Sequence, residues 1–206
     1  NREILPNNVK PNKYTLKLKP NFNDFVFDGV LDFSFDVLEK TNTIVLNSKE
    51  LNIQKAKFLN NDVEIINIEL DENLERVTFT LNKFLDENNY NLIIEYQGIL
   101  NDQMAGFYKS KYLDTNNQEK YLAVTQFEAV DARRGLPCMD EPVHKAKFQI
   151  SLVIPENLIG LSNTELIKEE KLDDNNKLLT FAETPVMSTY LLAFFVGEAD
   201  YTTNYA

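Results

Sequence analysis

The amino-acid sequence predicts an all-β domain, mainly antiparallel, with a saddle-like or sandwich arrangement and only minor short helix. Apolar and polar residues alternate with a period of two over many short segments, which is typical of strands that face a core on one side. Clusters of Asn, Asp and Pro separate these segments and predict turns. No amphipathic pattern is longer than about two helical turns, so an alternation of strands with long helices is not expected.

The clearest alternation begins near the start of the chain. Tyr14, Leu16 and Leu18 alternate with threonine and lysine residues, so one face of this segment points at a core and the other at water. The same pattern predicts strands at residues 31–37, 77–81, 92–96 and 148–154. Weaker signals predict strands at residues 44–46, 65–68 and 178–181, and a buried strand at residues 121–125.

Polar segments connect the predicted strands. The polar segment 108–120 is predicted to be an exposed loop, with Asn116 and Asn117 at its tip. Because there is no flexible Gly/Ser linker and no internal repeat, residues 1–206 are expected to form one domain. Turns are predicted at residues 20–21, 60–62, 86–89 and 173–176.

The net charge of −11 excludes some classes of partner. Such a chain would repel nucleic acid and anionic membrane surfaces, and no apolar run approaches the roughly 20 residues of a spanning helix, so neither partner is expected. The single cysteine, Cys138, cannot form an intrachain disulfide, and the chain opens without a secretory signal. A cytoplasmic location is therefore expected, unless a leader that preceded Asn1 has been removed.

Residues for hydrolytic chemistry are scarce. A zinc hydrolase helix uses two histidines one turn apart plus a glutamate base, and this chain has one histidine, His144. Cys138, Asp140 and Glu141 lie close to it, but their spacing matches no standard set of ligands, so no metal is expected there. A nucleophilic pair of Cys138 and His144 is equally unsupported, and a buried free cysteine is the simpler interpretation.

The stretch TQFEAVDARRGLPCMDEP, residues 125–142, contains the most distinctive polar residues. Gln126 and Glu128 come at the end of the predicted strand 121–125 and, being two residues apart, are expected to point to the same side. An amide and a carboxylate at a strand end would form a cradle for a cation. An ordinary solvated pair is the alternative interpretation.

The second half of this stretch has a structural interpretation. Arg133 is predicted to clamp the carboxylate of Asp140, while Pro137 and Pro142 stiffen the path of the loop. If buried, such a pair specifies the shape of a loop more than it adds net stability, because desolvation offsets much of the attraction. Asp131 is predicted to cap the short helical turn that follows it.

Five segments carry a resemblance to a known family. The segment TQFEAVDARRGLPCMDEPVHKAKF resembles the signature near the end of the amino-terminal domain of M1 zinc aminopeptidases, especially the cytosolic puromycin-sensitive type and its fungal relatives. LPNNVKPNKYTLKLKPN resembles the opening strand of that family, and GILNDQMAGFYKSKY resembles its next landmark. LSNTE together with TPVMSTYLLAFFVGE resembles its closing segment, so the resemblance covers nearly the whole chain.

The resemblance implies an amino-terminal β saddle domain over residues 1–206, whose partners are a peptide with a free amino terminus and a downstream catalytic domain of the same parent chain. It implies that Glu128 binds the α-amine of the substrate, that Gln126 lines the pocket for the first side chain, and that Arg133 and Asp140 are structural. The zinc ligands of the parent would lie outside this chain, so the fragment alone is expected to be inactive and without a cofactor.

The chain departs from the family pattern at a few positions. Ala129-Val130 and Gly135-Leu136 stand where many relatives carry Pro-Thr and Ala-Phe, and Met139 replaces a frequent phenylalanine. These smaller and softer side chains leave the preference of the first pocket open.

Two other functions stay open at this point. Alternating strands alone would equally suit a stand-alone β-sandwich binding or adhesion module without catalysis. An inactive member of the family, retained as a peptide or ribosome-associated binder, would keep the saddle but lose the zinc ligands downstream. The aminopeptidase hypothesis further predicts an exposed apolar flank on which the catalytic domain docks.

Overall fold

The first long strand shows the predicted alternation of buried and exposed side chains. The structure, a computed structural model, describes residues 4–59 and 62–200. Tyr14, Leu16 and Leu18 lie in strand β1 (Val9–Asn21) with no exposed surface, and the lysines between Leu16 and Pro20 face solvent. The prediction of an all-β, mainly antiparallel domain is confirmed.

Fourteen strands form three sheets in the described residues. The first sheet has the order β12 (Leu166–Lys171), β13 (Asn176–Phe181), β10 (Lys147–Pro155), β1, β2 (Val26–Val37), β7 (Asn89–Ile99) and β4 (Asn52–Phe58). The second has the order β11 (Ile159–Ser162), β14 (Phe194–Gly197), β9 (Glu119–Gln126) and β8 (Gly106–Leu113). The third has the order β3 (Thr41–Asn47), β6 (Arg76–Leu85) and β5 (Ile65–Asp71).

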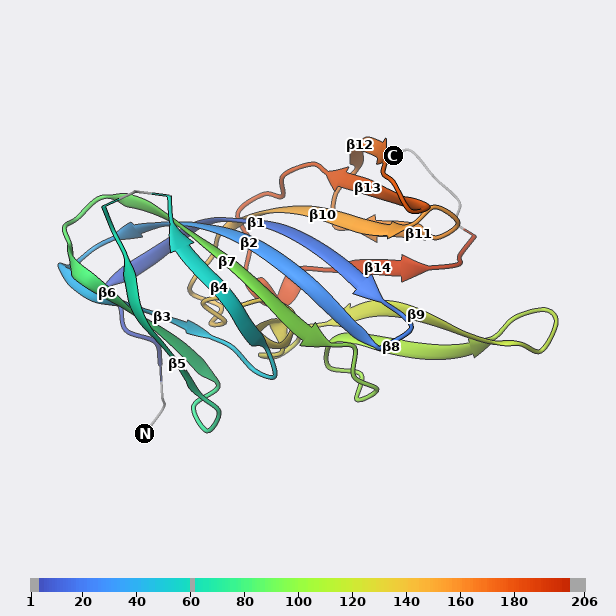
Figure 1. The fold of residues 1–206 in the computed structure, drawn as a ribbon, viewed down its shortest axis with the longest axis horizontal. Helices are drawn as coiled ribbons and strands as arrows, with labels where there is room; N and C mark the ends of the chain where they lie inside the picture. Colours follow the sequence, from blue (N-terminus) through green and yellow to red (C-terminus); the bar gives the residue numbers. More distant parts are fainter. Residues whose placement is uncertain (1–3, 60–61, 201–206) are drawn as a thin grey trace.

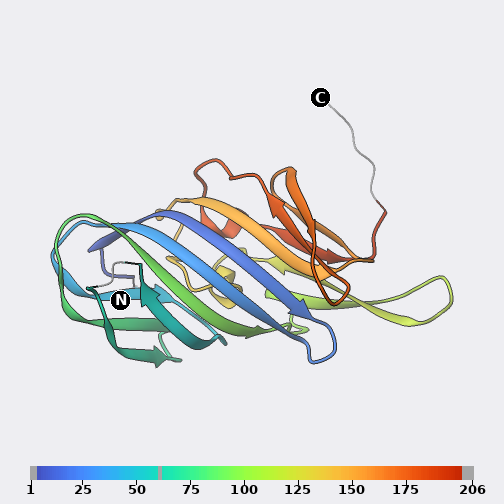
Figure 2. The ribbon, with the colours of Figure 1, turned by 45° about the horizontal axis from the view of Figure 1, so that its top comes forward.

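The long strands of the first sheet cross the molecule and unite its two ends. Strands β3, β5 and β6 lie near one end of β1, β2 and β7, and β8, β9 and β14 lie near the other end (Figure 1). Among the described strand pairs, β1 and β10 run parallel and the others run antiparallel. The turned view in Figure 2 shows β1, β2, β7 and β10 curving side by side over the elements beneath them.

Aromatic side chains fill the core under the long strands. The ring of Tyr14 stacks on Phe33 and Phe148 with centroid distances of 4.9 and 5.1 Å. Phe107 from β8 packs edge-on against Phe27 from β2, with centroids 5.1 Å apart, and so joins the first and second sheets. These contacts bury large apolar area on both sides of the sheet junction, which stabilises the arrangement of the sheets.

The prediction of an exposed loop at residues 108–120 is wrong. Strands β8 and β9 form an antiparallel hairpin there, and only residues 114–118 turn between them, with Asn117 at a φ of 59°. Much of this hairpin is polar because it extends away from the core, so both faces of its outer part are partly exposed and alternation is weak (Figure 1). Of the predicted turn at residues 60–62, positions 60 and 61 lie outside the described residues.

Helix is confined to two short turns in the described part of the chain. The 3-10 turn η1 (Ala132–Arg134) and the 3-10 turn η2 (Thr189–Leu191) confirm the prediction of minor helix. The first lies in the connection from β9 to β10, residues 127–146, which runs between the second and third sheets (Figure 1). Two isolated bridges, Asn47 with Cys138 and Ala146 with Met187, tie this connection to its neighbours.

Candidate functional site

The candidate site begins where β9 ends. Gln126 is the last residue of β9, is exposed, and is paired with Gly106 of β8. Phe127 follows with 2% of its surface exposed and packs against Phe194, the two ring centroids being 5.8 Å apart. Glu128 is exposed again. The buried Phe127 therefore anchors the chain between two solvent-facing polar residues, and a shared role of these two residues stays a prediction.

A hydrogen bond from strand β14 holds the end of strand β9 in place. The backbone N–H of Phe194 donates to Thr125 Oγ1 at 3.1 Å. Beyond the strand, the N–H of Asp131 donates to the carbonyl oxygen of Phe127 at 3.0 Å, which closes a turn around Glu128. Glu128 thus lies on a short backbone segment that is held on both sides.

The ion pair of Arg133 and Asp140 closes the connection on itself. Arg133 Nε donates to Asp140 Oδ2 at 3.1 Å, and the Arg133 backbone N–H donates to the same oxygen at 3.2 Å. The Asp140 side chain is 1% exposed and that of Arg133 is 13% exposed. The pair that the sequence predicts is therefore present and buried; that it fixes the shape of the loop stays a prediction.

Asp140 has further partners outside the connection. Its Oδ1 accepts a hydrogen bond from Thr189 Oγ1 at 2.7 Å, and its backbone N–H donates to Asn47 Oδ1 at 3.0 Å. A buried carboxylate needs such donors, because an unsatisfied charge in the interior is costly. Asp140 therefore joins the connection to η2 and to the end of β3.

Glu75 extends this network to the third sheet. Arg133 Nη1 donates to Glu75 Oε2 at 3.0 Å, and Lys49 forms an ion pair with the other oxygen of Glu75. Partial burial alone would raise the pKa of Glu75, but the hydrogen bonds from Lys49 and Arg133 outweigh it and lower the pKa below its ordinary value. No local sequence signal identifies Glu75, since it is 58 residues from Arg133.

Asp131 pairs with Arg134 and does not cap the turn η1. Asp131 occupies the N-cap position of η1 but makes no side-chain capping bond, so the predicted cap is wrong. Its Oδ1 instead accepts a hydrogen bond from Arg134 Nε at 2.9 Å, and Arg134 also forms an ion pair with Glu50. Gly106, at a φ of +75°, lies against Arg134, because a Cβ atom there would come within 2.5 Å of Arg134 Cβ.

Two buried tyrosines hold the next part of the connection. The backbone N–H of Met139 donates to the hydroxyl oxygen of Tyr14 at 3.1 Å. The hydroxyl of Tyr96 donates to the carbonyl oxygen of Gly135 at 2.8 Å. Burial raises the pKa of both tyrosines well above their ordinary values, so both stay neutral. These residues escaped the sequence reasoning because their alternation with polar neighbours marks them only as core.

The residues that could be imagined as a metal or nucleophile site do not fit one. Within residues 4–59 and 62–200, no group of three or more His, Cys, Asp or Glu side chains could hold a metal ion. Cys138 is fully buried, and this burial, followed by the nearby Asp140, raises the pKa of its thiol well above the usual value. His144 Nε2 lies 4.0 Å from a Glu141 carboxylate oxygen, and among the described residues it is not part of any group of potential metal ligands.

The comparison with known proteins assigns the family. The sequence model of the peptidase M1 N-terminal domain family matches residues 10–191. The chain belongs to this family. The M1 resemblance that the sequence predicted is confirmed. In the part of the chain that the structure describes, no helix is long and apolar enough to cross a membrane.

The relatives of this M1 N-terminal domain are named aminopeptidases. It is 44% identical over 204 residues to Aminopeptidase 2 from Candida albicans, covering 98% of this chain and 22% of that protein. It is 41% identical over 208 residues to the alanine/arginine aminopeptidase of Saccharomyces cerevisiae, covering 98% and 24%. It is 37% identical over 203 residues to the puromycin-sensitive aminopeptidase of Caenorhabditis elegans, covering 97% and 21%. The chain thus spans less than a quarter of the length of these curated relatives.

Proposed function

We propose that this domain anchors the amino terminus of a peptide in a zinc-dependent aminopeptidase. Glu128 binds the protonated α-amine, and Gln126 lines the pocket for the first side chain. The observation that supports this assignment is the exposure of both polar side chains on either side of the buried Phe127, at a strand end. The names of the relatives support the reaction class.

The chemistry of the α-amine suits a carboxylate at this position. Its pKa of about 8 keeps most of it protonated at neutral pH, so an ion pair with Glu128 is available to nearly every unblocked peptide. Holding the amine at one point fixes where the first peptide bond lies, which is what separates removal of one residue from internal cleavage. A blocked amino terminus would lose this contact.

The network behind Glu128 supports the same assignment. An anchor must be held to within a fraction of an ångström, which requires supporting residues that are themselves fixed. The Arg133–Asp140 pair, the Thr189 hydroxyl and the Tyr96 hydroxyl supply such support from three separate elements.

The zinc ion and the catalytic residues belong, in this proposal, to a part of the parent protein beyond this domain. The described residues do not fit a zinc site, so no catalytic step is assigned to them. The 206-residue chain alone is expected to be inactive. Exposed apolar side chains near the connection, among them Val130 and Val143, are candidates for contact with that part, being 46% and 76% exposed.

A cytoplasmic location of the parent is part of the same proposal. The single, buried cysteine supports it, because a secreted domain of this size usually carries disulfides. One relative from Saccharomyces cerevisiae is named as mitochondrial, so fractionation of cells that express the tagged full-length protein is the test.

The decisive experiment compares Glu128→Ala with the unmodified full-length protein. The measured quantity is kcat/KM on a peptide with a free amino terminus and on its N-acetylated copy. Losing a charge-assisted anchor is expected to cost roughly 2 to 4 kcal/mol, or about 30- to 1000-fold, on the free amine, with little change on the acetylated copy. Gln126→Ala is expected to change the preference for the first residue.

Glu119→Ala is the matched control. Glu119 opens the same strand, and its side chain is 57% exposed and paired only with Lys111 at the surface. This variant should leave both substrates unaffected. Equal activity of Glu128→Ala and the unmodified protein would refute the anchor, and an inactive full-length protein would favour the binding-module or inactive-member alternatives.

A further inference from the structure

Strand β5 is the outer strand of the third sheet, and one of its edges is unpaired. In the part of the chain that the structure describes, β5 pairs with β6 and with no other strand. Alternate backbone N–H and C=O groups of an edge strand point away from the sheet, so β5 offers them to an incoming strand. The opposite edge of this sheet is β3, which is tied to the connection through the bridge of Asn47 and Cys138.

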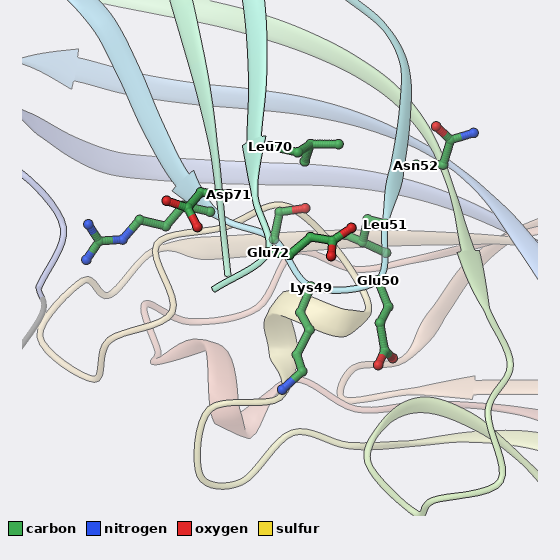
Figure 3. Close-up of a pocket in the computed structure, with 9 residues that line it drawn as sticks. Lys49, Glu50, Leu51, Asn52, Leu70, Asp71 and Glu72 are labelled. Carbon is green, nitrogen blue, oxygen red and sulfur yellow. The ribbon is translucent and has the colours of Figure 1, made fainter. Parts of the chain in front are cut away.

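The core-facing side of β5 is only half covered. Ile68 lies opposite Phe79 of β6, which is fully buried. Leu70 lies opposite Val77, which is also fully buried. Ile68 and Leu70 themselves are 38% and 47% exposed, and Figure 3 shows the Leu70 side chain on the side of β5 toward Leu51. A strand added beyond β5 would cover both side chains.

The other face of β5 is acidic. Glu69 is exposed and lies opposite Thr78, which carries no charge. Asp71 points to the same face as Glu69, and Figure 3 shows its carboxylate on the side of β5 away from Leu51. Arg76 lies opposite Asp71 and compensates part of its charge, so Glu69 is the main attraction for a basic side chain on a neighbouring strand.

The other sheet edges are protected against added strands. Strands β4, β8 and β12 each carry two lysines, which disfavour pairing at an edge: Lys55 and Lys57, Lys109 and Lys111, and Lys168 and Lys171. Strand β11 has four residues, and β3 is partly covered by Cys138 and by Asn8, whose Nδ2 donates to the carbonyl oxygen of Thr43. Strand β5 carries no lysine, arginine or proline. Its bulge lies near its start, between Ile65 and Asn67, so residues 67–71 keep a regular register.

We propose that residues 67–71 of β5 bind an extended segment of another protein, in which aliphatic and basic residues alternate, as an added strand. The aliphatic side chains pack on Ile68 and Leu70, a basic side chain pairs with Glu69, and the two backbones form a ladder of hydrogen bonds. A second copy of this chain suits the edge poorly, because its net charge of −11 would bring further carboxylates.

The remainder of the parent protein is not the occupant in this proposal. The exposed side chains assigned above to contact with that part, Val130 and Val143, lie in the connection, which is tied to β3. The edge of β5 is the other edge of the same sheet. Binding there does not depend on the role proposed for Glu128.

The test uses the full-length protein and a fluorescent form of the peptide acetyl-KVKIKVK-amide. The blocked amino terminus prevents this peptide from using the proposed amine anchor. Fluorescence anisotropy should show saturable binding, and Glu69→Lys should weaken it by about 5- to 30-fold, because a cross-strand attraction becomes a repulsion. Glu69 is exposed, so this change does not threaten folding, and kcat/KM on short peptides with a free amino terminus should stay unchanged.

Two controls separate strand addition from simple attraction between opposite charges. Glu165→Lys makes the same change in net charge at an exposed residue directly before β12, an edge of the first sheet, and should bind the peptide normally. The peptide acetyl-KKKKVVI-amide has the same composition without the alternation and should bind at least about 10-fold more weakly.

Backbone methylation tests the ladder directly. Only one alternate set of peptide N–H groups can face β5, so methylating the nitrogens of one set should abolish binding, whereas methylating the other set should not. Absence of binding to the full-length protein, the same effect of both methylated peptides, or equal affinity of Glu69→Lys and the unmodified protein would overturn the proposal. A dimer of the full-length protein that Ile68→Lys dissociates would assign the edge to a second copy and would overturn it as well.

Discussion

Arg133 and Asp140 form a buried ion pair, with Nε and Oδ2 separated by 3.1 Å, inside the connection that carries Glu128. Both partners are also bound by other elements: Glu75 accepts from Arg133, and Thr189 donates to Asp140. The pair therefore links the third sheet, the connection and η2 in one polar network. Networks of this kind specify one arrangement because a half-satisfied arrangement is costly.

Replacing Asp140 with Ala should destabilise the domain by about 3 kcal/mol. The change leaves the largely buried Arg133 without its main partner and the Thr189 hydroxyl without its acceptor. Urea unfolding of the purified chain measures the difference. Asp131→Ala is the control. The Asp131 side chain is 27% exposed, so its ion pair with Arg134 should contribute at most about 1 kcal/mol to stability. Equal losses in the two variants would contradict a special role for Asp140.

Removing the hydroxyl of Tyr14 should cost about 1–3 kcal/mol, although the aromatic stack is retained. In Tyr14→Phe, the N–H of Met139 loses its acceptor, and because Met139 has no exposed surface, bulk water does not replace the lost hydroxyl. Chemical denaturation provides the measurement. Tyr90→Phe is a suitable comparison, since the Tyr90 hydroxyl donates to the backbone carbonyl oxygen of Asp86 at the surface, and this bond should be worth less than about 0.5 kcal/mol. A Tyr14→Phe protein as stable as Tyr90→Phe would show that the Met139 bond contributes little.

Strands could be predicted where one face is buried and the other solvated. Residues 14–18 and 31–37 alternate cleanly because β1 and β2 lie in the middle of the first sheet with their inner face on the aromatic core. The edge strand β12 carries charged residues on both faces and gives no such pattern. The same reason explains the hairpin that was predicted as a loop.

The candidate site was predictable only as far as local sequence reaches. Gln126, Glu128, Arg133 and Asp140 lie within fifteen residues, so spacing and chemistry single them out. Glu75 and Thr189 approach the same network from two turns that are distant in sequence, and no pattern in their own neighbourhoods indicates it. The cap predicted for Asp131 failed because Arg134 offers its carboxylate a charged donor, which a cap does not.

Cys138 should be inert toward thiol reagents while the chain is folded. It has no exposed surface, and its raised thiol pKa leaves almost no thiolate at neutral pH. Ellman's reagent at pH 7.5 should therefore react slowly with the native chain. With the chain unfolded in guanidinium, it should release one equivalent of thionitrobenzoate, since the sequence has one cysteine. Rapid reaction of the native chain would indicate that the connection opens readily, and would revive a reactive role for this residue.

Acidification should destabilise the domain through His144. Burial lowers the pKa of His144 below its ordinary value of 6.5, and the opposing effect of Glu141 is smaller. The folded chain therefore binds fewer protons at this site than the unfolded chain, so stability is present above pH 6.5 and is lost as the pH falls from there toward the folded-state pKa. Because His144 is the single histidine, His144→Gln isolates its contribution. Urea unfolding between pH 7.5 and 5.5 should show a steeper loss for the unmodified chain than for His144→Gln. Parallel curves for the two proteins would mean that His144 has the same pKa in both states, and that its side chain is protonated within the fold without cost.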